Sequence, residues 1–296
     1  MVSSMKKIAI VTDNYGGISS EEAQKLGVKI LSMPFFFGEE CFYEGESITR
    51  EEFFERLNSG EHVSTTQPTP DSVMNIWREA LEEAETVLHM PLSSGLSGAC
   101  NTAMIFAQEE EFEDKVFVVD IGRISTPMHR SILDALELVE EGYSAKEIKD
   151  ILEASREEMS IYIAVETLEH LKRGGRITPA AAAVGALLNI KPILRLNVGV
   201  LDSYMKCRGF KKAKREMLAA MKRDLETKFF EASEKGEVYL MAASSADEET
   251  TKAWVEEIKE YFPGMDVLCD PLCLGIACHT GEGALGIGCS CKPKRP

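Results

Sequence analysis

Apolar runs without polar alternation recur through the first half of the chain. They read KIAIVT at 7–12, VKILSMPFFF at 28–37, TVLHMPL at 86–92 and KVFVVD at 115–120. A strand that is apolar on both faces is buried on both faces, as in a parallel sheet between two layers of helices. We therefore predict an N-terminal α/β domain over residues 1–159, built as a three-layer α/β/α arrangement around a parallel sheet.

The stretches between these runs have helical spacing and helix-start signals. Thr49 and Glu52 form a capping box that opens a helix over 50–60. Further helices are predicted over 71–84, with Asp71 as the cap, and over 126–141 and 144–159. This alternation of strands and helices supports a parallel sheet for the first domain.

The pattern changes from residue 160 onward. Residues 191–210 predict two strands joined in a hairpin through 197–199, and a long helix is predicted over 211–233. Residues 180–189, AAAAVGALLN, predict a helix of small side chains. A hairpin mixed with longer crossovers is typical of a mixed sheet, so we predict a C-terminal α/β domain over 160–296, in which a mixed sheet and its helices form two layers.

Composition and charge narrow the function classes. The net charge is −16, which repels phosphate backbones and anionic lipid headgroups, so we expect no nucleic-acid partner. No run approaches the ~20 apolar residues of a membrane span, and the first apolar run ends at Asp13, so neither a span nor a signal peptide is expected. These features predict a cytoplasmic protein.

Eight cysteines are present, and none forms C-x-x-C. Cys289 and Cys291 are too close in sequence for the usual zinc pair, so reduced, packed thiols are expected. We expect no metal and no cofactor.

Polar residues follow three of the predicted strands: Asp13, the Ser93-Ser94-Gly95 segment and Asp120. Ligands of open parallel sheets bind beyond the carboxyl ends of the strands. Glycines in the 93–98 loop allow backbone N–H groups to approach a ligand, and the next helix directs its positive end there. The loop therefore predicts an anion site, with Ser97 as the cap of the helix.

A serine hydrolase is the enzymatic alternative. Gly95-Leu-Ser97-Gly-Ala99 nearly matches the nucleophile motif G-x-S-x-G, and His279 follows late in the chain. However, Ser97 lies inside a glycine-rich turn rather than directly after the strand, and no Asp is marked out to orient His279. We therefore do not expect an enzyme.

Two more polar clusters are candidates for the same site. Ser64, Thr65 and Thr66 precede Gln67-Pro68 in a segment that two prolines stiffen, so they either donate to a carboxylate or belong to an ordinary loop. The glycine-rich stretch 281–288 lacks the βαβ context of a dinucleotide site and presents His279, whose charge can change near neutral pH.

Positive charges of this acidic chain gather in LKRGGRIT and KCRGFKKAKRE. We expect most of these side chains to be solvated charges on the surface. The residues are Arg173, Arg176, Arg208, Lys211 and Lys212.

Six segments together resemble the DegV family, bacterial fatty-acid-binding proteins that include the FakB subunits of fatty acid kinase. They fall in order along nearly the whole chain and read IAIVTD at 8–13, TTQP at 65–68, SSGLSG at 93–98, LKRGGRIT at 171–178, LLNIKPIL at 187–194 and HTGEGALG at 279–286. Several of them are eight residues long, which makes the resemblance specific.

The resemblance implies two α/β domains with a long acyl chain buried between or within them. It implies that Thr65 and Ser94 hydrogen-bond the carboxylate, with Ser93 beside it and His279 close by. The polar clusters described above add Thr66 and Gly95 to these expected ligand-binding residues. The expected ligand is a C14–C18 fatty acid such as palmitate, stearate or oleate, and the segment 271–288 is expected to return to its headgroup.

The resemblance also implies that Arg208 lies near the headgroup and is used when a kinase subunit phosphorylates the bound fatty acid. The chain alone is then a non-catalytic lipid-binding subunit, and the alternative is a lipid carrier or sensor without a kinase. The chain departs from the family pattern at Asn14-Tyr15, at Ile121-Gly122 and at Gly209-Phe210. The last departure bears on kinase partnership more than on lipid binding.

Overall fold

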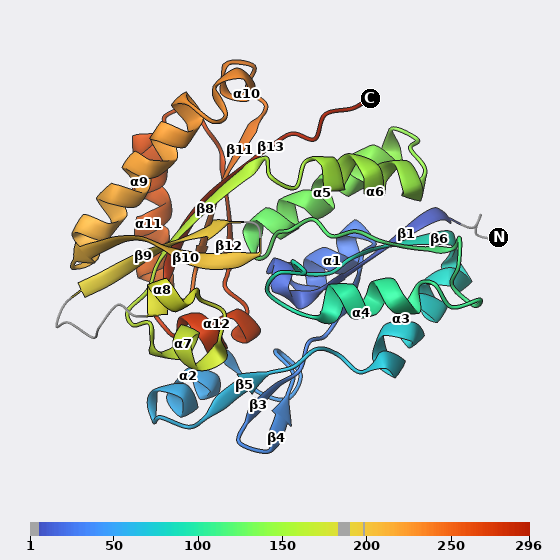
Figure 1. The fold of residues 1–296 in the computed structure, drawn as a ribbon, viewed down its shortest axis with the longest axis horizontal. Coiled ribbons are helices and arrows are strands. Elements are labelled where there is room, and N and C mark those ends of the chain that lie inside the picture. Colours follow the sequence, from blue (N-terminus) through green and yellow to red (C-terminus); the bar gives the residue numbers. More distant parts are fainter. Residues whose placement is uncertain (1–5, 183–189, 198) are drawn as a thin grey trace.

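The computed structural model describes residues 6–182, 190–197 and 199–296, and they contain two large sheets surrounded by helices (Figure 1). The N-terminal sheet is parallel, with the strand order β2-β1-β6-β7. Its strands are β1 (Lys6–Asp13), β2 (Lys29–Leu31), β6 (Ala84–Met90) and β7 (Val116–Val118).

Helices cover both faces of this sheet. On one face, α3 (Pro70–Glu83) and α4 (Ala99–Phe106) bury Trp77 and Ala103 against the strands. The other face is covered by helices that share its second apolar cluster, namely α1 (Ser20–Leu26), α5 (Thr126–Glu140) and α6 (Ala145–Ala154). The predicted three-layer arrangement is confirmed.

The second sheet is mixed and has the order β10-β9-β8-β13-β11-β12. Among its described pairings, only β11 with β12 is parallel. α9 (Phe210–Glu226) and α11 (Glu248–Tyr261) pack on one face, as the predicted two-layer arrangement requires. The strands are β8 (Met159–Ala164), β9 (Ile190–Asn197), β10 (Val200–Arg208), β11 (Val238–Ser244), β12 (Val267–Pro271) and β13 (Leu285–Cys291).

A third, small sheet was not predicted. The run at 28–37 was expected to be one strand, but it divides into β2 and β3 (Phe35–Phe37). Asn14 Oδ1 accepts the Met33 N–H at 3.1 Å, and Pro34 has no N–H to donate, so the first ladder cannot continue. β3 pairs instead with β4 (Glu40–Phe42) and β5 (Val63–Thr65), and α2 (Arg50–Asn58) adds Phe53 to their phenylalanine cluster.

Three helix predictions need correction or fall outside the description. α3 is capped by Thr69 with Pro70 at its first position, so Asp71 lies in the first turn instead. The helix predicted over 211–233 is broken into α9 and α10 (Phe230–Glu234). Of the predicted helix 180–189, residues 183–189 lie outside the described residues, as does residue 198 of the predicted hairpin turn.

The two large sheets face each other across α5. Its first residue, Thr126, donates its hydroxyl to the Ala242 carbonyl of β11 at 2.8 Å, and His129 Nδ1 lies 3.0 Å from Asp270 Oδ2 in β12. α12 (Leu274–Thr280) packs against α2, β5 and α7 (Glu169–Gly174), so a late segment of the chain reaches the small sheet before β13 returns to the mixed sheet. The division at residue 159, where β8 begins, stays a prediction.

Candidate functional site

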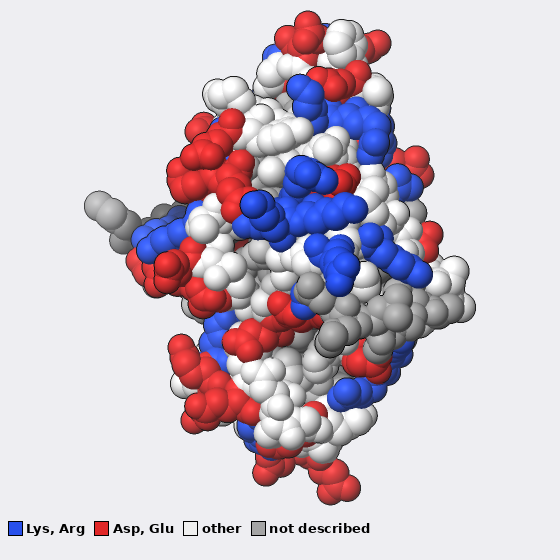
Figure 2. Space-filling view, turned by 90° about the vertical axis from the view of Figure 1, so that its left-hand side faces the viewer, with Lys and Arg blue, Asp and Glu red and all other residues white. Residues whose placement is uncertain are grey.

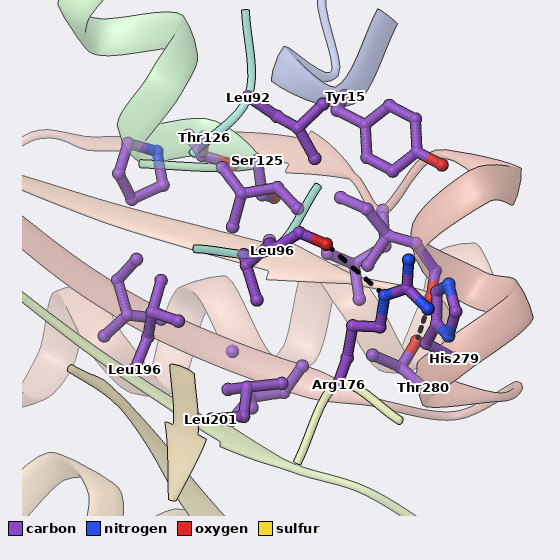
Figure 3. A pocket seen from close by; sticks show the side chains of 18 of the residues that line it. Tyr15, Leu92, Leu96, Ser125, Thr126, Arg176, Leu196, Leu201, His279 and Thr280 are labelled. Carbon is purple, nitrogen blue, oxygen red and sulfur yellow. Dashed lines mark hydrogen bonds between the residues drawn. The ribbon is translucent and has the colours of Figure 1, made fainter. Parts of the chain in front are cut away.

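A cavity of about 410 Å³ lies between the two sheets. Its floor is the open face of the second sheet, including Ile161, Ile163 and Leu196, and its opposite wall includes Leu92 and Leu96 (Figure 3). On β13 the cavity is lined by Gly286, Ile287 and Gly288, and Leu285 and Ile287 also belong to the core on the other face of the sheet. The interior therefore favours an apolar ligand.

Polar side chains gather at one end of this cavity. Thr65 and Thr66 come from the end of β5, Arg176 follows α7, and His279 and Thr280 end α12. Arg176, His279 and Thr280 lie close together in Figure 3, on the side away from Leu196. Three separate segments of the chain thus build one polar end on an apolar cavity.

His279 is fixed by contacts on both sides. Its Nε2 lies 2.9 Å from the Thr65 hydroxyl, and its Nδ1 is buried without a hydrogen-bond partner among the described residues. A Cβ on Gly174 would come within 2.0 Å of that Nδ1, so only glycine leaves room for the ring. Gly281 ends α12 with a φ of 74°, a conformation that glycine adopts without strain.

Burial lowers the pKa of His279 to about 4, and the nearby charges of Arg176 and His170 act in the same direction. The imidazole is therefore neutral at pH 7, and one ring nitrogen donates while the other accepts. This corrects the expectation that the charge of His279 changes near neutral pH. In the described structure, the positive charge at this end comes from another residue.

That residue is Arg176, which was expected to be a solvated surface charge. Its Nε donates to the Leu96 carbonyl at 3.3 Å and its Nη1 to the Gly174 carbonyl, and no ion pair with a described carboxylate is present. Its guanidinium lines the cavity while the neighbouring Arg173 is exposed. The available signal was its place in LKRGGRIT, directly after two glycines that turn the chain.

The 93–98 loop is arranged differently from the prediction. Ser94 donates its hydroxyl to Asp120, which also pairs with Arg156 at 2.9 Å. The Ser93 hydroxyl accepts the N–H of Gly95 at 3.3 Å. None of Ser93, Ser94 and Gly95 lines the cavity, whereas Leu96, Ser97 and Gly98 do. An ionised carboxylate is a strong acceptor, which explains why Asp120 holds the Ser94 hydroxyl.

Ser94 and Gly95 line a smaller pocket of about 280 Å³ instead, which shares Arg176 with the main cavity. Gly95 packs directly on the β9–β10 hairpin, since an ideal Cβ on Gly95 would lie 2.2 Å from the Cα of Gly199. The carboxylate-binding roles of Ser93, Ser94 and Gly95 stay predictions.

Asp13, at the end of β1, anchors the same loop from below. Its two carboxylate oxygens accept the N–H groups of Tyr15 at 2.9 Å and Leu92 at 2.8 Å. Burial raises the pKa of Asp13 to about 7, against the lowering effect of these hydrogen bonds. Asp13 therefore shapes the cavity wall rather than contacting a ligand.

Two further sequence candidates are Ser97, which lines the cavity, and Arg208. Ser97 is not the N-cap of α4, which is Gly98; its hydroxyl accepts the Ala99 N–H at 3.2 Å, and His279 is bonded to Thr65 rather than to Ser97. Arg208 is exposed at the end of β10 and does not line the cavity. It stands just before α9, next to the exposed Lys206, Lys211 and Lys212. The strands β9 and β10 and helix α9 lie on the left of Figure 1, and Figure 2 shows Lys and Arg side chains gathered on that side of the molecule.

No helix in the described part of the chain is long and apolar enough to cross a membrane. Within 6–182, 190–197 and 199–296, no three His, Cys, Asp or Glu side chains are grouped as a metal site.

Comparisons with known proteins agree with this architecture. A family model described as "Uncharacterised protein, DegV family" matches residues 7–292. A DegV domain-containing protein of Halalkalibacterium halodurans is 32% identical over 288 residues, which cover 96% of this chain and 98% of the relative. A Clostridium perfringens relative is 29% identical over 96% of this chain and 97% of its own.

Solved structures extend the comparison. A Thermus thermophilus DegV family protein, described as binding fatty acid, shares 34% identity with a TM-score of 0.84, covering 96% of this chain and 99% of its own. DegV of Bacillus subtilis, described as a fatty acid binding protein, shares 28% identity with a TM-score of 0.81, covering 98% and 100%. The family match over nearly the whole sequence and the common fold lead to one conclusion: this chain belongs to the DegV family.

Proposed function

We propose that this protein binds a long-chain fatty acid in the cavity between its two sheets and presents the carboxylate to a partner fatty acid kinase. The observation that carries the proposal is an apolar cavity with an arginine at one end that has no carboxylate partner in the described structure. The descriptions of the Thermus thermophilus and Bacillus subtilis relatives as fatty acid binding proteins support the ligand class.

The acyl chain supplies most of the binding free energy. Burying a methylene contributes about 0.8 kcal/mol, so ~14 methylenes contribute on the order of 11 kcal/mol before the costs of association. A hydrogen bond to a charged group contributes about 1.5–3 kcal/mol. The proposed ligand is a C14–C18 chain such as palmitate, stearate or oleate, and the polar end fixes its direction.

The carboxylate lies against Arg176, with Thr65 and Thr66 as hydroxyl donors. Neutral His279 either donates a hydrogen bond from Nε2 to the Thr65 oxygen or accepts one from the Thr65 hydroxyl. When His279 is the donor, the Thr65 hydroxyl is free to donate to the ligand. Ser94 joins this set when it exchanges its bond to Asp120 for one to the carboxylate. Ser93 and Gly95 support the same loop, and the small pocket beside Arg176 leaves room for this exchange.

These groups bind a carboxylate but do not activate it. Phosphorylation of a carboxylate needs a nucleotide and a metal, which the partner kinase supplies in this proposal. Arg208 and the exposed Lys206, Lys211 and Lys212, at the junction of β10 and α9, form the basic face, and this face docks the acidic or phosphate-bearing site of that partner. The alternative is a carrier or sensor that has no kinase.

Lipid binding is tested by native mass spectrometry of the purified protein, followed by titration of the delipidated protein with acids of different lengths. We expect a bound C14–C18 acid and a loss of about 3 kcal/mol when the ligand is shortened by four carbons. A flat dependence on chain length would exclude the cavity as the acyl site.

Kinase partnership is tested separately by ATP-dependent formation of acyl phosphate, trapped with hydroxylamine, after addition of the organism's own kinase subunit. Arg208→Ala should retain fatty acid affinity and lose this product, while Lys235→Ala, a change at the exposed residue that follows α10, should retain both. If wild type binds lipid and no kinase uses it, the carrier alternative holds. Parallel loss of binding and turnover in Arg208→Ala would instead make Arg208 a carboxylate ligand.

A further inference from the structure

Ser125 is a polar residue in the wall of the acyl cavity, away from the polar end. It stands directly before α5, and it is 8% exposed. It lines the cavity, and its hydroxyl has no hydrogen-bond partner among the described residues. Figure 3 places Ser125 and Thr126 on the opposite side of the cavity from Arg176 and His279.

The backbone at Ser125 has an uncommon conformation. Its φ of 58° and ψ of −150° lie where glycine is favoured, and such a residue costs roughly 1–3 kcal/mol. The surroundings enforce it: the Ser125 N–H donates to the Tyr15 carbonyl at 2.8 Å, and the Ser125 carbonyl accepts the Met128 N–H at 2.8 Å. Strain of this kind is concentrated at functional sites.

The Ser125 hydroxyl does not cap helix α5. A serine before a helix normally caps it by accepting a backbone N–H, but Ser125 makes no such bond. The adjacent Thr126 hydroxyl is occupied by the Ala242 carbonyl. The positive end of the 15-residue helix α5 is thus directed toward the cavity beside a hydroxyl that is free to bind.

This place lies deep along the path of the acyl chain. Pro127 stands over β13, where a Cβ on Gly288 would be 3.3 Å from its Cγ. β13 begins with Leu285, just after the loop that follows His279, so Gly288 is farther along the strand from the polar end than Gly286. The neighbouring wall residues, Ile124 and Met241, are apolar.

We propose that Ser125 and the N-terminus of α5 form a second polar subsite, which binds a hydroxyl or oxo oxygen partway along an acyl chain. The proposal rests on the proposed fatty acid binding and names a ligand class within it: oxygenated long-chain fatty acids. A serine hydroxyl donates to an oxo group and both donates to and accepts from a hydroxyl, and the positive helix end favours oxygen in either case. An apolar chain leaves this hydroxyl unpaired.

The test compares the binding of stearic acid with that of 3-hydroxy-, 10-hydroxy-, 12-hydroxy- and 12-oxostearic acid by calorimetry on delipidated protein. The variants are Ser125→Ala and Ser125→Gly; the glycine relieves the backbone strain, so it separates the hydroxyl from folding effects. Stearic acid is the reference ligand in each protein, because its chain carries no oxygen that Ser125 could bind. Relative to stearic acid, we expect both variants to bind at least one mid-chain oxygenated acid about tenfold more weakly than wild type does, because its oxygen loses its partner.

The outcomes are distinguishable. If wild type binds stearic acid and both variants keep its relative affinities for all five acids, the subsite is overturned and the fatty acid proposal stands. The same holds if only 3-hydroxystearic acid responds, because that oxygen lies next to the carboxylate. If wild type binds none of the five acids, both proposals fail.

Discussion

Arg176 is the side chain on which the orientation of the ligand depends. It lines the cavity and donates to two backbone carbonyls, whereas Arg173 in the same turn is exposed. We expect Arg176→Gln to weaken binding of palmitate by ten- to a hundredfold, since a hydrogen bond to a charged group contributes about 1.5–3 kcal/mol. Hexadecanol, which lacks the charge, should lose little.

Titration of both ligands into wild type, Arg176→Gln and Arg173→Gln measures this difference. Arg173→Gln removes the same charge at an exposed position, so its affinities for both ligands should equal those of wild type. Equal losses for palmitate and hexadecanol in Arg176→Gln would show that Arg176 shapes the cavity and does not recognise the carboxylate.

His89 is a buried residue whose lowered pKa makes the folding stability depend on pH. Its Nδ1 accepts the Trp77 indole N–H at 3.2 Å, and burial lowers its pKa from 6.5 to about 3. Between these values the unfolded chain binds a proton that the folded chain does not, so folding stability rises with pH. The stabilising contribution is complete above pH 6.5 and is lost as the pH falls toward about 3.

Urea unfolding of wild type and His89→Gln at several pH values tests this sign. Wild type should lose up to about 1.4 kcal/mol per pH unit more than the variant below pH 6.5. Asp13, whose pKa is raised to about 7, acts in the opposite direction in both proteins and cancels from the comparison. Parallel pH profiles would mean that His89 already titrates in the folded state.

At the scale of elements, α7 and α12 hold each other through the contact of Gly174 with His279. A Cβ at Gly174 would meet the buried ring at 2.0 Å, so Gly174→Ala should destabilise the fold by about 1–3 kcal/mol and weaken fatty acid binding. The double variant Gly174→Ala, His279→Ala has room for the methyl group and should regain stability but not binding. Thermal unfolding of the four proteins gives the coupling energy.

Gly175→Asn is the matched control for this cycle. Gly175 has a φ of 67° and nothing within 4 Å of an added Cβ, and asparagine tolerates that conformation. Its stability should fall by less than that of Gly174→Ala. Simple additivity of Gly174→Ala and His279→Ala would contradict the proposed contact.

Helices and strands were predicted correctly where the apolar pattern was continuous. Predictions failed where a single hydrogen-bonding group determines where an element ends. β1 and β6 are apolar on both faces, which fixed the parallel sheet. The division of 28–37 depends on the Asn14 side chain reaching Met33 across the fold, which no local pattern contains. Likewise, Thr65 and His279 were found as separate polar clusters, while their 2.9 Å contact needed the path of α12.

The unpredicted parts of the site share one physical cause. Whether Arg176 is a solvated charge or a cavity wall depends on Leu96 and Gly174, whose carbonyls hold it. Ser94 was expected to face the ligand, and the carboxylate of Asp120 holds it elsewhere in the described structure. Competition between polar partners is decided by three-dimensional distance, which sequence alone does not give.

At the scale of the molecule, the cavity is lined by the mixed sheet on one side and by loops that follow strands of the parallel sheet on the other, so a bound acyl chain should stabilise both parts together. A ligand present at a hundred times its Kd adds about 2.7 kcal/mol, which corresponds to a rise in Tm of about 5 °C for a chain of this size. Hydrogen exchange with bound palmitate should slow in β6 and in β13 alike. Butyrate, which has the carboxylate without the long tail, is the control and should change neither.

Slower exchange in both β6 and β13 would require the ligand to contact the parts of the protein built on each large sheet at the same time. Protection confined to β13 and its neighbours would place the acyl chain on one sheet only and would contradict a cavity shared between them. A second unfolding transition that the ligand leaves unshifted would lead to the same conclusion.

The contact of Gly95 with Gly199 also limits how the protein can change in evolution. At most sites where a larger residue causes a clash, a second mutation that shrinks the partner restores the fit. Here both partners are already glycine, and an added Cβ at either one meets the backbone of the other at 2.2 or 2.7 Å. A genetic screen starting from Gly95→Ala should therefore yield reversion or changes in the length of the hairpin, and no compensating substitution at position 199.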